Sequence, residues 1–209
     1  MSHSEILWDV DTQVDFVHQG GRLVVPGAHA AIPAMARLVA WAREHAIPHV
    51  ASADDHELTD PEISTEPDFA STYPPHCLRG TRGAQRIAET EQLDPLVLSH
   101  VAYPPPLVSE LIEGRREILL LKKSFDVFTN PNAEAVLDAL DPVEIIVFGV
   151  ATDVCDDAAI KGLLRRGRRV AFVEDAARGL DEERTRACLE QWRGAGVRFT
   201  TSEHVTAAS

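Results

Sequence analysis

The chain has 209 residues, of which 44% are hydrophobic and 25% are charged, and its formal net charge is −13. This composition excludes disordered and fibrous classes, and the length allows a sizeable core without disulfides or structural metals. A strongly negative chain repels nucleic acid phosphates, so nucleic acid is not an expected partner. We therefore expect one globular domain over residues 1–209.

The cysteines and the N-terminal segment indicate a cellular location. Cys77, Cys155 and Cys188 are an odd number at wide spacing, which is typical of a reducing compartment rather than of a disulfide framework. The first fifteen residues are acidic and lack the basic flank and apolar stretch of a signal peptide. No run approaches the ~18 apolar residues that span a membrane. The sequence predicts a cytoplasmic protein without a membrane partner.

Strand-like and helix-like segments alternate along most of the chain. Short apolar runs predict six strands near residues 5, 47, 117, 144, 168 and 197, and apolar residues spaced three and four apart predict helices over 30–45, 131–140, 153–167 and 181–196. This alternation predicts an α/β fold with a mostly parallel sheet covered on both faces.

One segment, at about 54–117, breaks the alternation. It is rich in proline and acidic residues, and we expect it to be a loop-rich insertion with one short helix near 83–91. Because ligands of such sheets bind beyond the carboxyl ends of the strands, where loops converge, this insertion is expected to form a wall of the site.

Residues suited to catalysis follow the ends of several predicted strands. Asp11 ends the first strand, Lys122 ends the third, and Cys155 follows the fourth at the start of a helix. The positive end of a helix dipole favours a thiolate, a carboxylate can move protons, and an ammonium can hold both groups. The alternatives are a small buried cysteine, a turn aspartate and a surface lysine.

Three strings resemble motifs of the isochorismatase-like cysteine hydrolases. They are "DVDTQVDF", "KKSFDVF" and "GVATDVC", in the order of that family, and the resemblance extends over about residues 5–201. It implies a three-layer α/β/α sandwich with a six-stranded parallel sheet. It also implies that Asp11 is the catalytic carboxylate, Lys122 its partner and Cys155 the nucleophile.

The same resemblance decides between two lysines and predicts a backbone feature. Lys123 is the rival of Lys122, but the family spacing K-x-x-[FY]-x-x-F fits Lys122. A cis peptide between Val150 and Ala151 is implied, and it would direct the backbone N–H groups of Ala151 and Cys155 at a substrate oxygen.

Two further strings, "ASADDHE" and "YPPHCLRGTRGA", resemble the metal-binding segments of nicotinamidases. They imply a divalent ion bound by Asp54, His56 and His76. One carboxylate and two imidazoles leave open positions on Zn, Mn or Fe, and we expect Zn. The alternative is a set of polar loop residues bonded to the backbone. Whether Asp55 or Glu62 also contacts the ion or its waters stays open.

The resemblance implies a cysteine amidohydrolase that hydrolyses a small carboxamide, with nicotinamide as the expected substrate and a thioester on the cysteine. The alternatives are another small amide or ureido substrate, or a ligand-binding member of the fold without turnover. Phe16 and Tyr73 offer aromatic faces to a flat ring, although Phe16 equally suits the core. Cys77 and Cys188 are expected to be packing residues, and the resemblance suggests a homo-oligomer.

Overall fold

The structure, a computed structural model, describes residues 4–207. A seven-stranded sheet in the order β3-β4-β2-β1-β5-β6-β7 forms its centre, and all neighbouring strands are parallel. The strands are β1 (Glu5–Val10), β2 (His49–Asp54), β3 (Leu96–Leu98), β4 (Glu117–Lys122), β5 (Glu144–Val150), β6 (Arg169–Arg178) and β7 (Arg198–Thr200).

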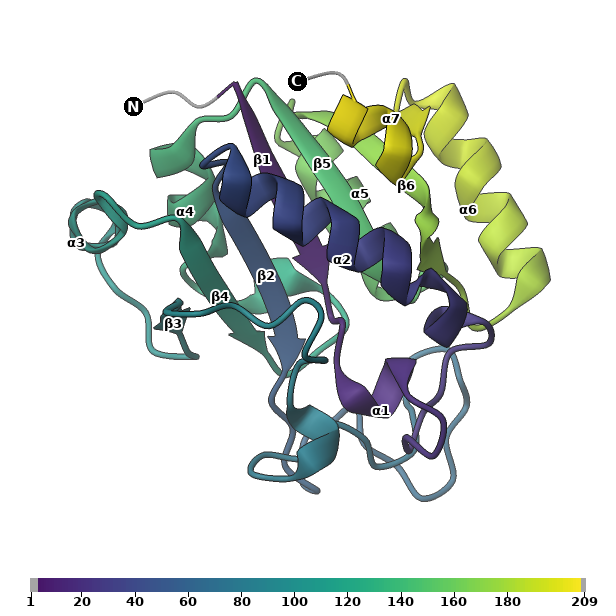
Figure 1. The fold of residues 1–209 in the computed structure, drawn as a ribbon. Helices are drawn as coiled ribbons and strands as arrows, with labels where there is room; N and C mark the ends of the chain where they lie inside the picture. Colours follow the sequence, from purple (N-terminus) through teal and green to yellow (C-terminus); the bar gives the residue numbers. More distant parts are fainter. Residues whose placement is uncertain (1–3, 208–209) are drawn as a thin grey trace.

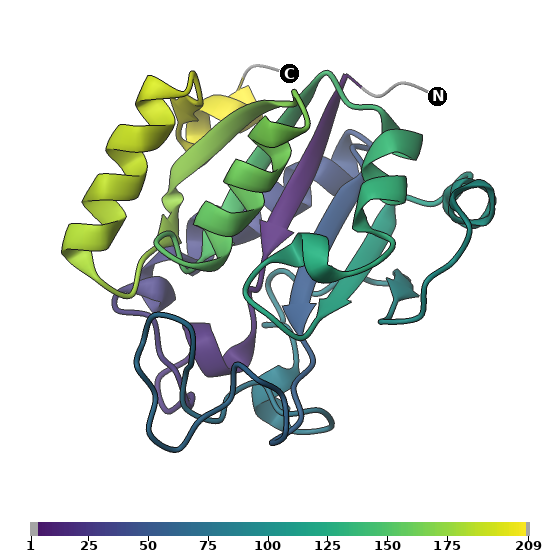
Figure 2. The ribbon, with the colours of Figure 1, turned by 180° about the vertical axis from the view of Figure 1, so that it is seen from behind.

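Helices cover both faces of this sheet. They are α1 (Val14–Val17), α2 (Ala28–Glu44), α3 (Pro105–Ile112), α4 (Ala133–Leu140), α5 (Cys155–Arg165), α6 (Glu182–Gly194) and α7 (Ser202–Ala207), with the 3-10 turns η1 (Arg82–Ala84) and η2 (Val127–Thr129). Helices α2 and α7 lie on one face (Figure 1), and α4 and α5 lie on the other (Figure 2). The expected three-layer arrangement is confirmed.

Burial explains why the central strands are almost entirely apolar. β1 and β5 lie between two hydrophobic cores, one on each face of the sheet, and strands buried on both faces carry continuous rather than alternating apolar residues. β5 follows this rule, with Ile145 through Val150 buried. β1 follows it except at Asp9, a fully buried carboxylate in the middle strand of the sheet.

The insertion differs from its prediction in three places. The sheet has seven strands rather than six, because Leu96–Leu98 forms a short edge strand paired only with β4. The helix predicted near 83–91 is wrong: only η1 is helical there, and Arg86 pairs with Gln13 as an isolated bridge. Helix α3 was not predicted, since its prolines lie at the first helical positions, where proline is tolerated.

The carboxyl ends of β1, β2, β4 and β5 meet at one edge of the sheet. Residues 55–84 coil beyond these ends beside α1, at the bottom of the view in Figure 1. The start of β1 and helix α7 lie at the opposite end of the molecule. Among the helices of residues 4–207, none has the length and apolar character needed to cross a membrane.

Candidate active site

The thiol of Cys155 lies at the amino end of α5, directly after the turn that follows β5. The peptide bond between Val150 and Ala151 is cis. Within residues 4–207, neither the Ala151 nor the Cys155 backbone N–H donates to an acceptor, and both residues line the same cavity. Two free N–H groups beside a nucleophile can stabilise an oxyanion that forms on a substrate carbonyl.

Asp11 and Lys122 lie beside this thiol and are completely buried. The Lys122 Nζ is 2.8 Å from Asp11 Oδ2 and 3.8 Å from Cys155 Sγ. Asp11 follows the end of β1 with a φ of 49°, and its Oδ1 accepts a hydrogen bond of 2.7 Å from the Ser52 hydroxyl on β2. Three neighbouring strand ends and one helix start therefore bring a carboxylate, an ammonium and a thiol together.

The environment sets the protonation of this group. Burial raises the pKa of the Cys155 thiol well above its ordinary value, and the Lys122 ammonium only partly opposes this effect. Burial also raises the pKa of Asp11, again against the attraction of Lys122. Burial therefore opposes the stabilisation of a thiolate that the helix start was expected to provide. The arrangement contains a thiol and, beside it, a carboxylate with increased basicity.

Four donor side chains gather next to this group: Asp54, His56, Glu62 and His76. One ligand atom from each lies within 4.8 Å of all the others. Asp54 Oδ2 is 3.7 Å from His56 Nε2 and 3.5 Å from His76 Nε2, and Glu62 Oε1 is 3.8 Å and 4.0 Å from the same two nitrogens. Ligands bound tetrahedrally at ~2.1 Å lie ~3.4 Å apart, so these separations suit a divalent ion.

Hydrogen bonding outside the cluster leaves the required lone pairs free. His76 Nδ1 is 2.7 Å from the Pro74 carbonyl oxygen, which assigns the proton to Nδ1 and leaves Nε2 as a ligand. His56 Nε2 and Asp54 Oδ2 are buried and have no hydrogen-bond partner among the described residues. Burial would raise the pKa of Asp54, but Lys122 and the two histidines hold it well below its usual value. The donor set is an imidazole and carboxylate site of the kind that binds Zn.

A cavity opens between the thiol and the donor cluster. Cys155 and Ala151 line one side, and His76, Phe16 and Tyr73 line another. The rings of Phe16 and His76 have centroids 5.2 Å apart. The free volume inside is about 10 Å³, roughly the space of one water molecule. Phe16 and Tyr73 thus both lie on the wall of a cavity with little free space.

The structure distinguishes between residues that the sequence left as alternatives. Lys123 points away from the thiol and pairs with Asp60 at 2.9 Å, whereas Lys122 is inside the site. Asp55 binds Arg79 and lies outside the donor cluster, whereas Glu62 joins it.

The two other cysteines lie apart from the catalytic group. Cys77 is buried in the core on the α2 face, and its backbone N–H donates to Asp15. Cys188 packs at the edge of the opposite core.

Sequence reasoning missed the apolar wall of the cavity, which is formed by Leu23, Val25, Val154 and Leu180. No motif marks these residues, since they come from connections whose course depends on tertiary packing. Glu62 carried a weak signal as an acidic residue between the two histidine segments.

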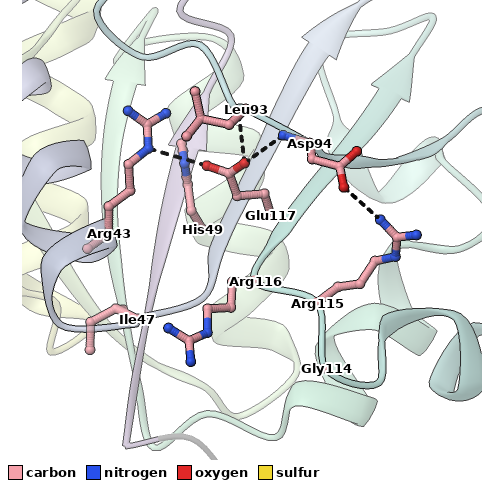
Figure 3. A pocket seen from close by; sticks show the side chains of 10 residues that line it. Arg43, Ile47, His49, Leu93, Asp94, Gly114, Arg115, Arg116 and Glu117 are labelled. Atoms are coloured by element: carbon pink, nitrogen blue, oxygen red, sulfur yellow. Dashed lines mark hydrogen bonds and ion pairs between the residues drawn. The ribbon is translucent and has the colours of Figure 1, made fainter.

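A second hollow lies at the amino ends of β2 and β4, away from the cysteine (Figure 3). Its charged groups bond to each other: Glu117 is 3.4 Å from Arg43 and accepts from the backbone N–H groups of Leu93 and Asp94. His49 closes the floor of this hollow. No residue lining it offers a thiol or hydroxyl nucleophile, so the cavity at the carboxyl ends is the candidate active site.

Comparison with known proteins gives consistent matches over almost the whole chain. A family model described as an isochorismatase domain matches residues 6–204. The nicotinamidase/pyrazinamidase of Mycobacterium tuberculosis is 29% identical over 202 residues, covering 92% of this chain and 96% of that protein.

Two solved structures illustrate the likeness in fold. The pyrazinamidase of Pyrococcus horikoshii in complex with zinc has a TM-score of 0.72 at 22% identity, covering 95% of this chain and 99% of its own. The N-carbamoylsarcosine amidase of Thermoplasma acidophilum has a TM-score of 0.72 at 22% identity, covering 97% of each chain.

Proposed function

We propose that this chain, which belongs to the isochorismatase family, is a metal-containing cysteine amidohydrolase that converts a small carboxamide to its acid and ammonia. One observation carries the proposal: the buried Cys155 thiol, which lies beside Lys122, and three of the four donor-cluster residues line the same small cavity. The curated relative from M. tuberculosis is named a nicotinamidase/pyrazinamidase, and nicotinamide is the substrate that we propose.

In the acylation half of the reaction, the Cys155 sulfur attacks the amide carbon while its proton moves to Asp11. The carbonyl π electrons move to oxygen, and the free N–H groups of Ala151 and Cys155 stabilise the resulting oxyanion. When the tetrahedral adduct collapses, the C–N bond breaks and Asp11 returns the proton to nitrogen. Ammonia leaves, and the acyl group remains on sulfur as a thioester.

In the second half, water attacks the thioester carbon while Asp11 removes a proton from that water. The C–S bond breaks, the carboxylic acid is released, and Asp11 returns the proton to sulfur. Lys122 stays protonated throughout, since the surrounding carboxylates overcome its burial and raise its pKa well above the usual value. Its fixed charge holds Asp11 in place through the 2.8 Å contact.

The donor cluster supports a metal of the zinc type in this function. Asp54, His56 and His76 would hold the ion, Glu62 would lie beside it, and the ion would bind a ring nitrogen of the substrate. Because His76 also contacts Phe16, an aromatic ring bound at this end of the cavity would lie against Phe16 with its amide toward Cys155.

A related amide or ureido compound is the second candidate. A structural relative with this fold is named an N-carbamoylsarcosine amidase, and the polar hydroxyl-bearing Tyr73 lines the cavity. A homo-oligomer in the cytoplasm stays a prediction from the sequence and the resemblance.

A substrate panel tests the proposal. The purified protein, loaded with Zn, is assayed for ammonia release from nicotinamide, benzamide and N-carbamoylsarcosine. Nicotinamide is expected to have the highest kcat/KM, and benzamide a lower value because it lacks the ring nitrogen. A preference for the carbamoyl compound would support the second candidate, and equal rates for nicotinamide and benzamide would contradict the ring-nitrogen contact.

The covalent step has its own test. Cys155→Ala removes the nucleophile and little volume, so it should abolish ammonia release while the protein keeps its fold and metal content. Cys188→Ala is the matched control and should retain activity. A Cys155→Ala protein with more than a few per cent of the wild-type rate would contradict the thioester mechanism.

A further inference from the structure

A second buried ion pair lies directly behind the catalytic carboxylate, and no step described above uses it. Asp9 is completely buried on β1, two residues before Asp11. Its ion-pair partner is Arg86 of the insertion, whose side chain is only 6% exposed. Burial alone would raise the pKa of Asp9, but Arg86 and His49 reverse the effect and lower it. Asp9 is therefore a charged group in the interior.

Two further groups hold the Asp9 carboxylate. Thr12 Oγ1 donates to Asp9 Oδ1 at 2.9 Å, and His49 Nε2 is 3.3 Å from Oδ2. His49 lies beside Arg43 and Glu117 in the hollow of Figure 3. The carboxylate thus has partners in the turn after β1, on β2 and in the insertion.

The guanidinium of Arg86 connects this carboxylate to the catalytic one. Its Nη2 also donates to the Thr90 carbonyl oxygen at 3.0 Å, and its Nη1 to the Ser52 carbonyl oxygen at 3.4 Å. The same Ser52 carbonyl accepts from the backbone N–H of Asp11 at 3.3 Å. The Ser52 hydroxyl donates to Asp11 Oδ1 at 2.7 Å. Ser52 therefore holds both the backbone and the carboxylate of Asp11, and Arg86 holds Ser52.

Residues 84–90 of the insertion also bind the segment just after Asp11. The Ile87 backbone N–H donates to the Thr12 carbonyl oxygen at 3.0 Å, and the hydroxyl oxygens of Thr12 and Thr90 are 2.6 Å apart. Gln13 Nε2 donates to the Ala84 carbonyl oxygen at 2.8 Å. Asp11 has a left-handed φ of 49°. Its neighbours Asp9, Thr12 and Gln13 all contact the short segment that carries Arg86.

A buried ion pair is weak evidence of a stabilising role, because apolar residues of similar size often replace such a pair without loss of stability. We propose that Arg86 is a positioning residue: bound to Asp9, it holds Ser52 and thereby the Asp11 carboxylate in the orientation required for proton transfer. This inference rests on the proposed function, in which Asp11 is the acid and base.

A double variant separates positioning from stability. Arg86→Met alone leaves a buried carboxylate without its partner, so a loss of both stability and activity is expected. In Asp9→Asn/Arg86→Met both charges are gone, and the thermal midpoint should return toward the wild-type value. If Arg86 positions Asp11, kcat of the double variant stays ~10- to 100-fold below wild type, with KM within about threefold because the cavity wall is intact.

Matched variants complete the test. Arg82→Met, an exposed arginine in η1 with no side-chain partner among the described residues, should leave kcat unchanged. Arg86→Lys keeps the charge opposite Asp9 but lacks the planar fork whose Nη1 and Nη2 bind Ser52 and Thr90, so it should remain folded with a lowered kcat. Wild-type kcat in the double variant or in Arg86→Lys would overturn the proposal.

A failure of the positioning role of Arg86 can be distinguished from a failure of the proposed function. If the wild-type protein releases no ammonia from any amide, the proposed function fails while the positioning role can still be examined. A crystal structure of the double variant then shows whether the Asp11 carboxylate has left the Ser52 hydroxyl, as the inference expects. An Asp11 carboxylate unmoved from Ser52 and Lys122 would overturn the inference.

Discussion

Two glycines in helices offer a matched pair of substitutions with opposite expected effects. Gly162 lies inside α5, the helix that begins at Cys155, and an added Cβ would be 2.3 Å from two carbon atoms of the Phe128 ring. Gly194 ends α6, and an added Cβ there would meet nothing within 4 Å. The methyl group added by Gly→Ala would therefore meet a packed ring in one helix and open space in the other.

The expected magnitudes follow from two opposing terms. Alanine in a helix interior gains ~1 kcal/mol over glycine. At Gly162 the ring must retreat by about 1.1 Å to reach an ordinary contact of 3.4 Å (3.4 − 2.3), and overpacking of this kind costs ~1–3 kcal/mol. The ring has little room to move, because it stacks on Trp8 and lies 3.8 Å beneath the Arg166 guanidinium. Gly162→Ala should lose ~1 kcal/mol net.

Gly194→Ala should gain ~0.5 kcal/mol, so the two variants should differ by ~1.5 kcal/mol. Urea denaturation measures the difference directly, and in a chain of this size the thermal midpoints should separate by ~3–6 °C. Adding Phe128→Leu to Gly162→Ala should recover part of the loss. If Gly162→Ala is as stable as Gly194→Ala, the packing of α5 against Phe128 does not limit stability as argued.

Three further predictions concern the site. His76→Ala should remove the bound Zn and raise KM for nicotinamide, while the rate at which iodoacetamide alkylates Cys155 stays nearly normal. Metal analysis and steady-state kinetics measure these effects, with His100→Ala as the control. An unchanged KM in a metal-free protein would contradict the donor assignment. Lys122→Met should abolish activity, whereas Lys123→Met should retain most of it; equal losses would contradict the choice of lysine.

The last of the three concerns Asp156, which is completely buried and whose carboxylate oxygens both lack hydrogen-bond partners among the described residues. Burial and the nearby carboxylates of Asp11 and Asp153 raise its pKa well above 3.8. The folded state then binds the proton more tightly, so this contribution to stability is complete below pH 3.8 and is lost as the pH rises toward the folded pKa. Asp156→Asn should therefore become more stable relative to wild type between pH 4 and pH 8 in urea titrations; a constant difference would contradict the shift.

The sequence predicted that the proposed catalytic residues lie close together because of a property of parallel sheets. Asp11, Lys122 and Cys155 each follow or end a strand, and the carboxyl ends of neighbouring parallel strands meet at one edge. Residues more than a hundred positions apart could thus be placed together from strand ends alone. The family spacing then selected Lys122, and the structure places it 2.8 Å from Asp11 while Lys123 faces Asp60.

The insertion was less predictable because few of its residues follow a helical or strand period. Arg86 lies in a segment predicted as helix, yet it is extended across the end of β1 by its bridge to Gln13. Asp9 looked like one more acidic residue near the N-terminus, and only the course of the insertion gives it a partner. Glu62 reaches the donor cluster in the same way. Local patterns cannot encode such contacts, since both partners depend on how a long connection folds back.

The small free volume of the cavity has a consequence for the rate of the enzyme. About 10 Å³ is less than an amide substrate occupies, so side chains of the wall that includes Tyr73 would have to move apart before binding and again before the acid product leaves. The frequency of opening therefore sets a ceiling on turnover that is independent of the chemistry at Cys155. Substitutions that loosen this wall would raise that ceiling without altering the chemical groups at Cys155.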